Sequence, residues 1–424
     1  MPKYLSTILG KAVKNIARLR GGGSALPGLV VERIDPDFIS RTLAPLPYGT
    51  VVVSGTNGKT TTTKMVVELL ESQGLTVFTN RTGSNFTRGV AAALLGDIDM
   101  KGRLDADIAV LELDEAHAIH FVNKIPPRYS LLLNVMRDQL DRFGEIDATA
   151  RLLQRIAEQT TDTVVLNRED PRVRKIGELP SERRVIYFGL SNQTRHLFPD
   201  DDSMRAQTKA SLAKLPDADV VLEHLEKQDA QFSFDGKSHT VNLKLQGIYN
   251  IYNAAAALTL VRTILENKKP LGDLLTALSS IQPAFGRGET LTVDGKPLEL
   301  VLVKNPSGFR LGLSSFPPEG YVTMIAINDN YADGRDMSWL WDVDFDSLRD
   351  GKVQMVSGIR AYDMGLRLQY EDVEVEDIDP HLLTALQKFI SAHSDMPKRI
   401  YCTYTAMLSI RRALAKITTV EHVS

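Results

Sequence analysis

The 424-residue sequence predicts an α/β protein, with a parallel sheet in its first large domain and a second α/β domain after it. Short runs of β-branched and aliphatic residues, such as residues 50–54 and 108–113, alternate with stretches of helical periodicity. These runs are mostly apolar, as expected for strands of a parallel sheet covered on both faces. The length also fits two or three domains.

The expected elements follow in order along the chain. A strand at 50–54 leads into a helix at 60–73, and residues 231–245 are expected to form a hairpin. Residues 190–228 are polar and aperiodic, so we expect an irregular surface excursion there. Further strands are expected at 75–79, 108–113, 129–135, 164–167, 185–188, 298–303, 322–327 and 353–357, and further helices at 254–265, 382–392 and 405–417.

The composition excludes several classes of protein. Fifty Lys and Arg residues against 53 Asp and Glu give a net charge of −3, which argues against a protein built around nucleic acid. The single cysteine, Cys402, excludes an internal disulfide and a cysteine-rich zinc site. No run of about 18 apolar residues occurs, and the basic N-terminus lacks the apolar core of a secretory signal. We therefore expect a cytoplasmic protein.

Residues 1–20 form a separate feature. Apolar residues recur there at helical spacing, and five Lys and Arg residues occur with no acidic residue. One interpretation is a basic amphipathic helix on the inner face of a membrane or on a partner. The other is a helix packed on its own protein with a solvated basic face. A glycine-rich break at 21–24 follows.

The strongest motif follows the strand at 50–54 and opens the next helix. Two glycines allow the backbone N–H groups to turn toward a polyphosphate, and the helix N-terminus adds positive potential. A lysine can reach the β- and γ-phosphates, and a threonine hydroxyl can ligate magnesium. The loop departs from the common pattern because Val53 stands where that pattern has glycine. The candidate binding residues are Gly55, Thr56, Asn57, Gly58, Lys59, Thr60 and Thr61.

Carboxylates follow two later strands. Glu112 lies near the end of the apolar run at 108–113, and Glu115 follows it closely. A carboxylate at the carboxyl end of a strand beside a phosphate loop can hold magnesium, although both residues could also be solvated loop acids. Asp138, after the strand at 129–135, is a further candidate for positioning metal or water. The arginines beside it, Arg137 and Arg142, could contact phosphate or pair with aspartates.

These motifs together resemble the Mur ligase family. Five blocks occur in the family's order: GTNGKTT (55–61), LELDE (111–115), NVMRDQLDRFG (134–144), GIYNIYNAAAAL (247–258) and GRGE (286–289). Later blocks, at 302–308, 328–336 and 338–342, are similar to the C-terminal domain of the family's MurT branch. The resemblance implies an N-terminal helix and connector (1–48), a central P-loop ATPase domain (49–286) and a Rossmann-like C-terminal domain (287–424).

The resemblance also implies chemistry. Residues 55–61 would hold ATP phosphates, Thr60 and Glu112 would serve magnesium, Asn250 and Asn253 would lie near the adenine, and Arg287 near the phosphates. The family converts a carboxylate to an acyl phosphate, from which an amine displaces phosphate. In the MurT branch the acid is the α-carboxylate of D-glutamate in the lipid II stem peptide, and the product is D-isoglutamine.

In that branch ammonia comes from a glutaminase subunit, GatD, in a heterodimer or larger assembly. The resemblance implies that Asp336 completes the partner's Cys–His site as a catalytic residue; an aspartate there would fix the histidine tautomer. A turn role is the alternative, and Asp329, Asp333 and Asp342 are rivals in the same stretch. The tryptophans at 339 and 341 alternate in a strand-like run and could be partner anchors or core.

Four departures from the wider family matter. Gln139 stands where ordinary Mur ligases have histidine, and no lysine occurs between 124 and 175, so a carbamylated lysine with a second magnesium is not expected. No cysteine occurs between 190 and 245, so we predict no zinc ribbon. Only about 48 residues precede the first strand, which is too short for a UDP-binding domain and fits a lipid-linked substrate.

Two other functions stay open. A ligase that adds an amino acid, such as a folylpolyglutamate synthase or a stem-peptide ligase, shares the phosphate loop but has no use for the block at 328–342. A non-catalytic nucleotide-binding scaffold of an amidotransferase would not need Lys59, Thr60 and Glu112 together.

Overall fold

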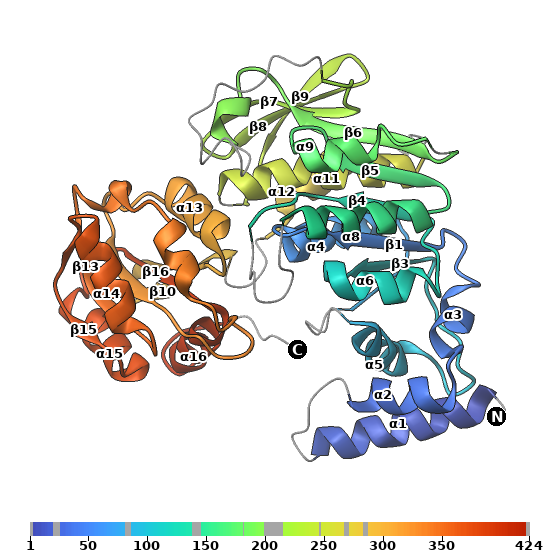
Figure 1. Ribbon diagram of the computed structural model, residues 1–424, viewed down its shortest axis with the longest axis horizontal. Coiled ribbons are helices and arrows are strands. Elements are labelled where there is room, and N and C mark those ends of the chain that lie inside the picture. Colours follow the sequence, from blue (N-terminus) through green and yellow to red (C-terminus); the bar gives the residue numbers. More distant parts are fainter. Residues whose placement is uncertain are drawn as a thin grey trace.

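The computed structural model describes residues 3–19, 26–80, 86–137, 146–180, 182–198, 215–245, 247–266, 271–282 and 287–420. Two sheets form the cores of two lobes, each with helices on both faces (Figure 1). The predicted α/β class is confirmed.

The first sheet has nine strands among the described residues, in the order β2-β3-β1-β4-β5-β6-β7-β8-β9. Strands β2 to β7 are parallel, and β7, β8 and β9 are antiparallel neighbours, so the expected hairpin is confirmed. Because β1 lies between β3 and β4, their carboxyl ends meet at one edge. The bounds are β1 Thr50–Ser54, β2 Val77–Thr79, β3 Ile108–Glu112, β4 Tyr129–Leu132, β5 Thr163–Asn167, β6 Arg184–Leu190, β7 Val220–Glu226, β8 Asp229–Phe234 and β9 Lys237–Asn242.

Both faces of this sheet are buried, which explains why its parallel strands are mostly apolar. Val51 and Val53 of β1 join the core on one face, and Val52 joins the core on the other. The first face packs on α4 (Lys59–Ser72), α11 (Ile248–Ile264) and α12 (Leu271–Ser280). The second packs on α3 (Phe38–Leu43), α5 (Thr87–Asp97), α6 (Glu115–Val122), α8 (Ile146–Gln159) and α9 (Pro171–Ile176).

The first helix corrects one expectation. Helix α1 (Lys3–Leu19) packs beside α2 (Leu26–Ile34) and α5, at the edge of the molecule (Figure 1). It therefore packs on its own protein, but the large side chains described on its solvated face are apolar. Leu5, Ile8, Leu9 and Ile16 are exposed, whereas small and polar residues face inward.

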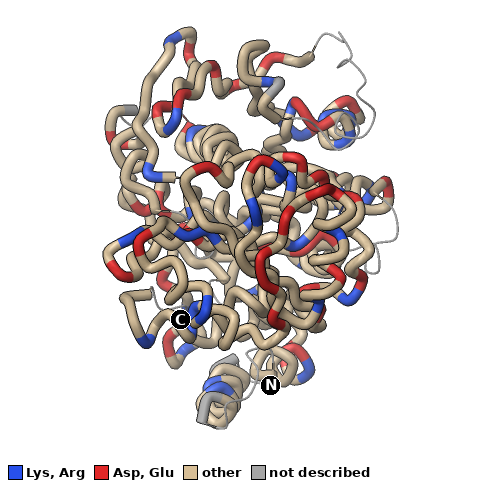
Figure 2. Tube along the Cα trace, turned by 90° about the vertical axis from the view of Figure 1, so that its left-hand side faces the viewer, with Lys and Arg blue, Asp and Glu red and all other residues tan. Residues whose placement is uncertain are grey.

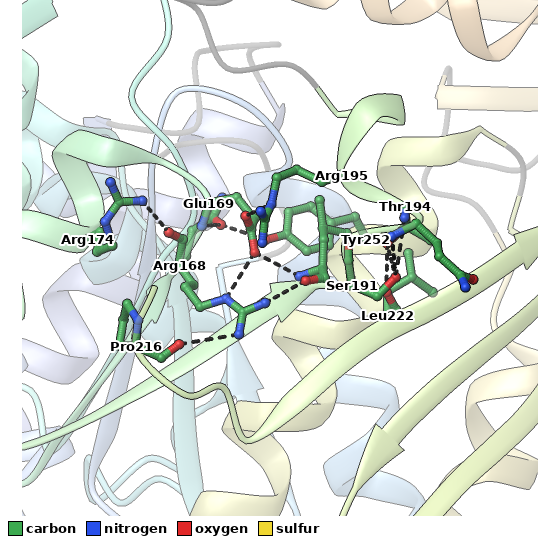
Figure 3. A network of polar contacts seen from close by, with 12 residues as sticks. Arg168, Glu169, Arg174, Ser191, Thr194, Arg195, Pro216, Leu222 and Tyr252 are labelled. Carbon is green, nitrogen blue, oxygen red and sulfur yellow. Dashed lines mark hydrogen bonds and ion pairs between the residues drawn. The ribbon is translucent and has the colours of Figure 1, made fainter. Parts of the chain in front are cut away.

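The expected irregular excursion at 190–228 is wrong in part, because β7 lies within it and pairs with β6. Residues 199–214 lie outside the described part of the chain. The segment that precedes them is tied down by polar contacts (Figure 3). Glu169 pairs with Arg195 at 2.9 Å and accepts from the backbone N–H of Leu190 at 3.0 Å. Thr194 Oγ1 donates to the Leu222 carbonyl at 2.8 Å.

The second sheet follows the order β10-β11-β16-β12-β13-β14, with β15 also paired to β13. All its strand pairs are parallel except β10 with β11. The strand-like run at 338–342 was predicted wrongly: it is a 3-10 helix, η2. The bounds in this lobe are β10 Arg287–Val293, β11 Lys296–Leu302, β12 Val322–Ala326, β13 Lys352–Ser357, β14 Glu374–Val375, β15 Ile378–Asp379, β16 Lys398–Cys402, α13 Pro306–Ser315, α14 Ala361–Tyr370, α15 Leu382–Ala392, α16 Tyr404–Leu414, η2 Ser338–Asp342 and η3 Asp346–Leu348. A further 3-10 helix, η1 (Arg195–Leu197), lies between β6 and β7 of the first sheet.

Charge is distributed over the whole chain. Figure 2 shows acidic and basic residues interspersed over the molecule in this view. Among the helices in the described segments, none combines the length and the hydropathy needed to cross a bilayer.

Candidate functional site

The loop between β1 and α4 is a backbone cradle. Gly55 and Gly58 have φ angles of 134° and 88°, the left-handed region that favours glycine. A Cβ on Gly58 would lie 2.7 Å from Asn253 Nδ2, so a side chain there would also collide with α11. Glycine at position 58 therefore lets the loop close tightly onto the N-terminus of α4, where backbone N–H groups favour an anion.

Lys59 is buried at the centre of this loop. Its Nζ donates to the carbonyl oxygens of Gly55 and Thr56, and it lies 3.4 Å from Glu115 Oε2. Glu115 is also buried, at the start of α6. A buried ammonium needs such partners, because an unpaired charge in the interior is costly. Glu115 is thus the carboxylate that pairs with the Lys59 ammonium.

The structure brings together the two residues predicted to serve magnesium. Thr60 Oγ1 donates to Glu112 Oε1 at 2.9 Å, from the first turn of α4 to the end of β3. Asn80 holds the backbone of Glu112 in place through two hydrogen bonds: its Nδ2 donates to the Glu112 carbonyl, and its Oδ1 accepts from the Glu112 N–H. A carboxylate and a hydroxyl are hard oxygen donors of the kind that magnesium prefers.

The end of β4 braces the same loop. The amide of Asn134 exchanges two hydrogen bonds with the backbone of Asn57, at 2.9 and 3.0 Å, and Thr56 Oγ1 accepts from Met136 N. Asp170 supports the next turn by accepting from Val135 N at 2.7 Å, and burial raises the pKa of this carboxyl to about 6. Asp138 lies outside the described residues, as does Arg142.

Of the two residues predicted to lie near the adenine, only Asn253 lies directly beside the phosphate loop. Asn253 is buried beside Gly58, one turn into α11, whereas Asn250 lies in the first turn, where its N–H donates to Gly247. Arg287 begins β10, but its side chain lies outside the described part.

The second lobe reaches the loop with two residues to which the sequence analysis assigned no individual role. Lys304 Nζ donates to the Thr56 carbonyl at 3.1 Å, and Asn305 Nδ2 donates to Asn57 Oδ1 at 3.2 Å. Asn305 also caps α13 by accepting from Gly308 N. The available signal was the Asn-Pro pair between strand and helix, which repeats the strand–loop–helix arrangement of the first site.

The four candidate aspartates have different environments. Asp329 pairs with Arg360 at 2.7 Å, and Asp342 pairs with Arg137 of the first lobe at 2.7 Å. Asp333 is buried and accepts from the N–H and hydroxyl of Thr405. Asp336 is partly exposed and accepts from Ser338 at 2.9 Å; the Ser338 side chain and N–H lower its pKa. Its carboxylate is therefore ionised at neutral pH.

An apolar stripe lies near the segment that carries Asp336, which we call the Asp336 loop. Tyr362, Leu366 and Tyr370 are exposed at every fourth position of α14, and the ring of Tyr370 lies 5.3 Å from that of exposed Trp341. We call these four residues the α14 face. Trp339 is 5% exposed and belongs to the core, so the two tryptophans have different roles.

Comparison with known proteins places this geometry in a family. Residues 53–261 match the Mur ligase middle domain, and residues 302–407 match the MurT ligase C-terminal domain. The chain is 32% identical to the lipid II isoglutaminyl synthase (glutamine-hydrolyzing) subunit MurT of Streptococcus pneumoniae, over 97% of this chain and 96% of that one. The chain belongs to the MurT family.

Solved structures agree with this MurT assignment at the level of fold. A pseudomurein peptide ligase type C from Methanothermus fervidus aligns with a TM-score of 0.69 and 19% identity, covering 90% of this chain and 81% of that chain. The MurF ligase from Thermotoga maritima, solved in complex with ADP, aligns with a TM-score of 0.63 and 18% identity, covering 89% and 81%.

Proposed function

We propose that this MurT-family chain is the ATP-consuming subunit of a lipid II isoglutaminyl synthase. It amidates the α-carboxylate of D-glutamate in the stem peptide to D-isoglutamine, using ammonia from a GatD-like glutaminase, in peptidoglycan synthesis. The observation that carries this proposal is the complete phosphate loop, with Lys59 at its centre and the Thr60–Glu112 pair beside it.

The loop fits a magnesium nucleotide. The cradle at Gly58 has no room for a Cβ, and Thr60 and Glu112 offer oxygen donors. Magnesium, when bound there, would neutralise charge on the transferring phosphoryl group. Lys59 would exchange its contacts with loop carbonyls for phosphate oxygens, and Glu115 keeps its ammonium charged and aimed. We assign adenine contacts to Asn250 and Asn253, and phosphate contact to Arg287, by resemblance.

A carboxylate is a poor electrophile, so it must be activated before ammonia can attack it. Its oxygen attacks the γ-phosphorus, the bond to ADP breaks, and an acyl phosphate forms. Ammonia then attacks the carbonyl carbon, phosphate leaves, and the nitrogen loses a proton. Lys304 and Asn305 reach the phosphate loop from the second lobe, so residues 287–424 can exclude water from the acyl phosphate.

The chain itself cannot supply a cysteine for glutamine hydrolysis. Its only cysteine, Cys402, is fully buried in β16, and burial raises the pKa of its thiol far above neutral. A nucleophilic cysteine needs an accessible thiolate. The nucleophile therefore belongs to another chain, which is the reason for proposing a glutaminase partner.

We assign the partner's docking site to the α14 face. Its residues lie close to the Asp336 loop, since Trp341 of η2 follows Asp336 by five positions and packs on Tyr370. Exposed aromatic residues of this kind anchor protein interfaces. Among the four aspartates, Asp336 alone has neither an arginine nor Thr405 as partner, and it would orient the partner's histidine.

The direct test uses purified protein, lipid II, magnesium, ATP and ammonium chloride. We expect isoglutamine formation without the glutaminase and its loss in Lys59→Ala. Incorporation of a labelled free amino acid would instead favour an amino-acid ligase. Nucleotide binding with no turnover in the complete two-subunit enzyme would favour a scaffold.

A further inference from the structure

Helix α1 is packed with its polar and small residues inward and its large apolar residues outward. Ser6, Thr7, Gly10 and Ala17 are buried. The opposite side carries Leu5, Ile8, Leu9 and Ile16, which are between 40% and 52% exposed. These four residues form one stripe, because helical positions three, four, seven and eight apart share a face. We call them the α1 stripe.

Close packing fixes this orientation. A Cβ on Gly10 would lie 2.5 Å from Val31 Cγ2 and 2.6 Å from Leu95 Cδ2, so the inner side admits no larger residue at that point. Lys11 Nζ donates to the Ile98 carbonyl at 2.7 Å, and Ser6 donates to Asp35 at 2.6 Å. The helix therefore cannot turn to bury Leu9 without losing these contacts.

Two segments near α1 also expose large apolar side chains. Leu26 at the start of α2 is 51% exposed, and Met100, in the loop that receives the Lys11 hydrogen bond, is 59% exposed. Figure 1 shows α1 on the outer side of α2, at the margin of the first lobe. An exposed cluster of this kind marks an interaction surface.

Charge distinguishes among the possible occupants. Residues 1–20 contain five basic residues and no acidic one. Three acidic residues on neighbouring elements are neutralised by arginine: Asp35 by Arg41, Glu32 by Arg88 and Asp99 by Arg103. An apolar stripe within a segment of net positive charge is complementary to an anionic lipid surface, where apolar side chains enter the headgroup boundary and the net charge of the segment favours the anionic side.

We propose that α1 docks this protein on an anionic membrane through the α1 stripe. This deepens the proposed function and rests on it for its purpose, because a lipid-linked substrate lies at such a surface. Helix α5 connects α1 with the neighbourhood of the phosphate loop. Its C-terminal half packs on α1 through Leu95, and Phe86 at its start contacts His117 of α6, close to Glu115. Its 11 residues span about 16 Å.

The test is cosedimentation of the full chain with vesicles of phosphatidylglycerol and phosphatidylcholine, against vesicles of phosphatidylcholine alone. We expect binding to the anionic vesicles that weakens as salt is raised. Leu9→Gln/Ile16→Gln removes apolar area without adding charge and should lower the partition coefficient by about tenfold or more. The matched control is Leu383→Gln/Ile417→Gln, which changes two exposed residues of the second lobe and should bind as wild type.

Three results would overturn the proposal. These are no binding to anionic vesicles, equal binding by both variants, or a dimer in sedimentation velocity that only the α1 variant abolishes, since a second copy would then cover the stripe. A vesicle-free amidation assay with a water-soluble stem-peptide analogue separates the two proposals. Activity there without vesicle binding overturns membrane docking alone, whereas vesicle binding without activity supports docking and removes the amidation.

Discussion

The Asp336→Asn variant separates the two half-reactions of the proposed enzyme. Asp336 is ionised, because hydrogen bonds from Ser338 lower its pKa, and asparagine keeps an oxygen that can accept from Ser338 N. The loop should therefore keep its shape, with a stability change of about 0.5 kcal/mol or less. What is lost is the negative charge that would hold the partner's histidine in its tautomer.

The size of that loss follows from analogous triads, in which replacing the aspartate by asparagine lowers turnover by about 10⁴. An aspartate contributed across an interface is held less rigidly, so we expect glutamine-driven amidation to fall by about 10²–10⁴. Ammonia-driven amidation should stay within about twofold of wild type, since Lys59 and Thr60 are untouched.

The assay follows isoglutamine on lipid II by mass spectrometry, with the two-subunit enzyme and either glutamine or ammonium chloride. Asp350→Asn, an exposed turn residue of the same lobe, is the control and should leave both activities unchanged. Equal loss with both nitrogen sources would refute the reasoning and give Asp336 a structural role. Full retention with glutamine would equally refute it.

Four further predictions concern single groups. Thr60→Val should raise the magnesium concentration for half-maximal turnover by about tenfold or more, and an unchanged requirement would contradict the metal assignment. Cys402 should not react with Ellman's reagent in the native protein and should react fully in denaturant. Removing Glu299, which pairs at 2.7 Å with buried Arg399, by Glu299→Ala should cost about 3–5 kcal/mol in urea unfolding; a loss under about 1 kcal/mol would contradict it. The pKa of Asp170 is raised from 3.8 to about 6, so its contribution to stability is present at low pH and lost as pH rises. Wild type should thus lose about 3 kcal/mol relative to Asp170→Asn between about pH 3 and 7, and parallel curves would refute this.

The sequence predicted those parts of the site that lie within one strand–loop–helix unit. Gly55, Gly58 and Lys59 needed no tertiary information, because the glycines and the helix start define the loop locally. Glu112 could be predicted from the sequence for a similar reason, since residues at the carboxyl ends of neighbouring parallel strands meet.

Contacts between distant segments were not predictable in this way. Lys304 and Asn305 lie far from the phosphate loop in sequence and reach it only because the second lobe packs there. The orientation of α1 was missed for a different reason. Periodicity identifies an apolar stripe, but it does not say whether the stripe faces inward, and Gly10 allowed the opposite side to pack more closely.

Oxygen transfer tests the central claim most directly. Lipid II carrying ¹⁸O in both oxygens of the D-glutamate α-carboxylate is amidated with ammonium chloride, and the released phosphate is analysed. Formation of an acyl phosphate predicts one ¹⁸O atom in each phosphate, with ADP and isoglutamine in equal amounts. Isoglutamine that appears with unlabelled phosphate, or with no ADP, would contradict the account.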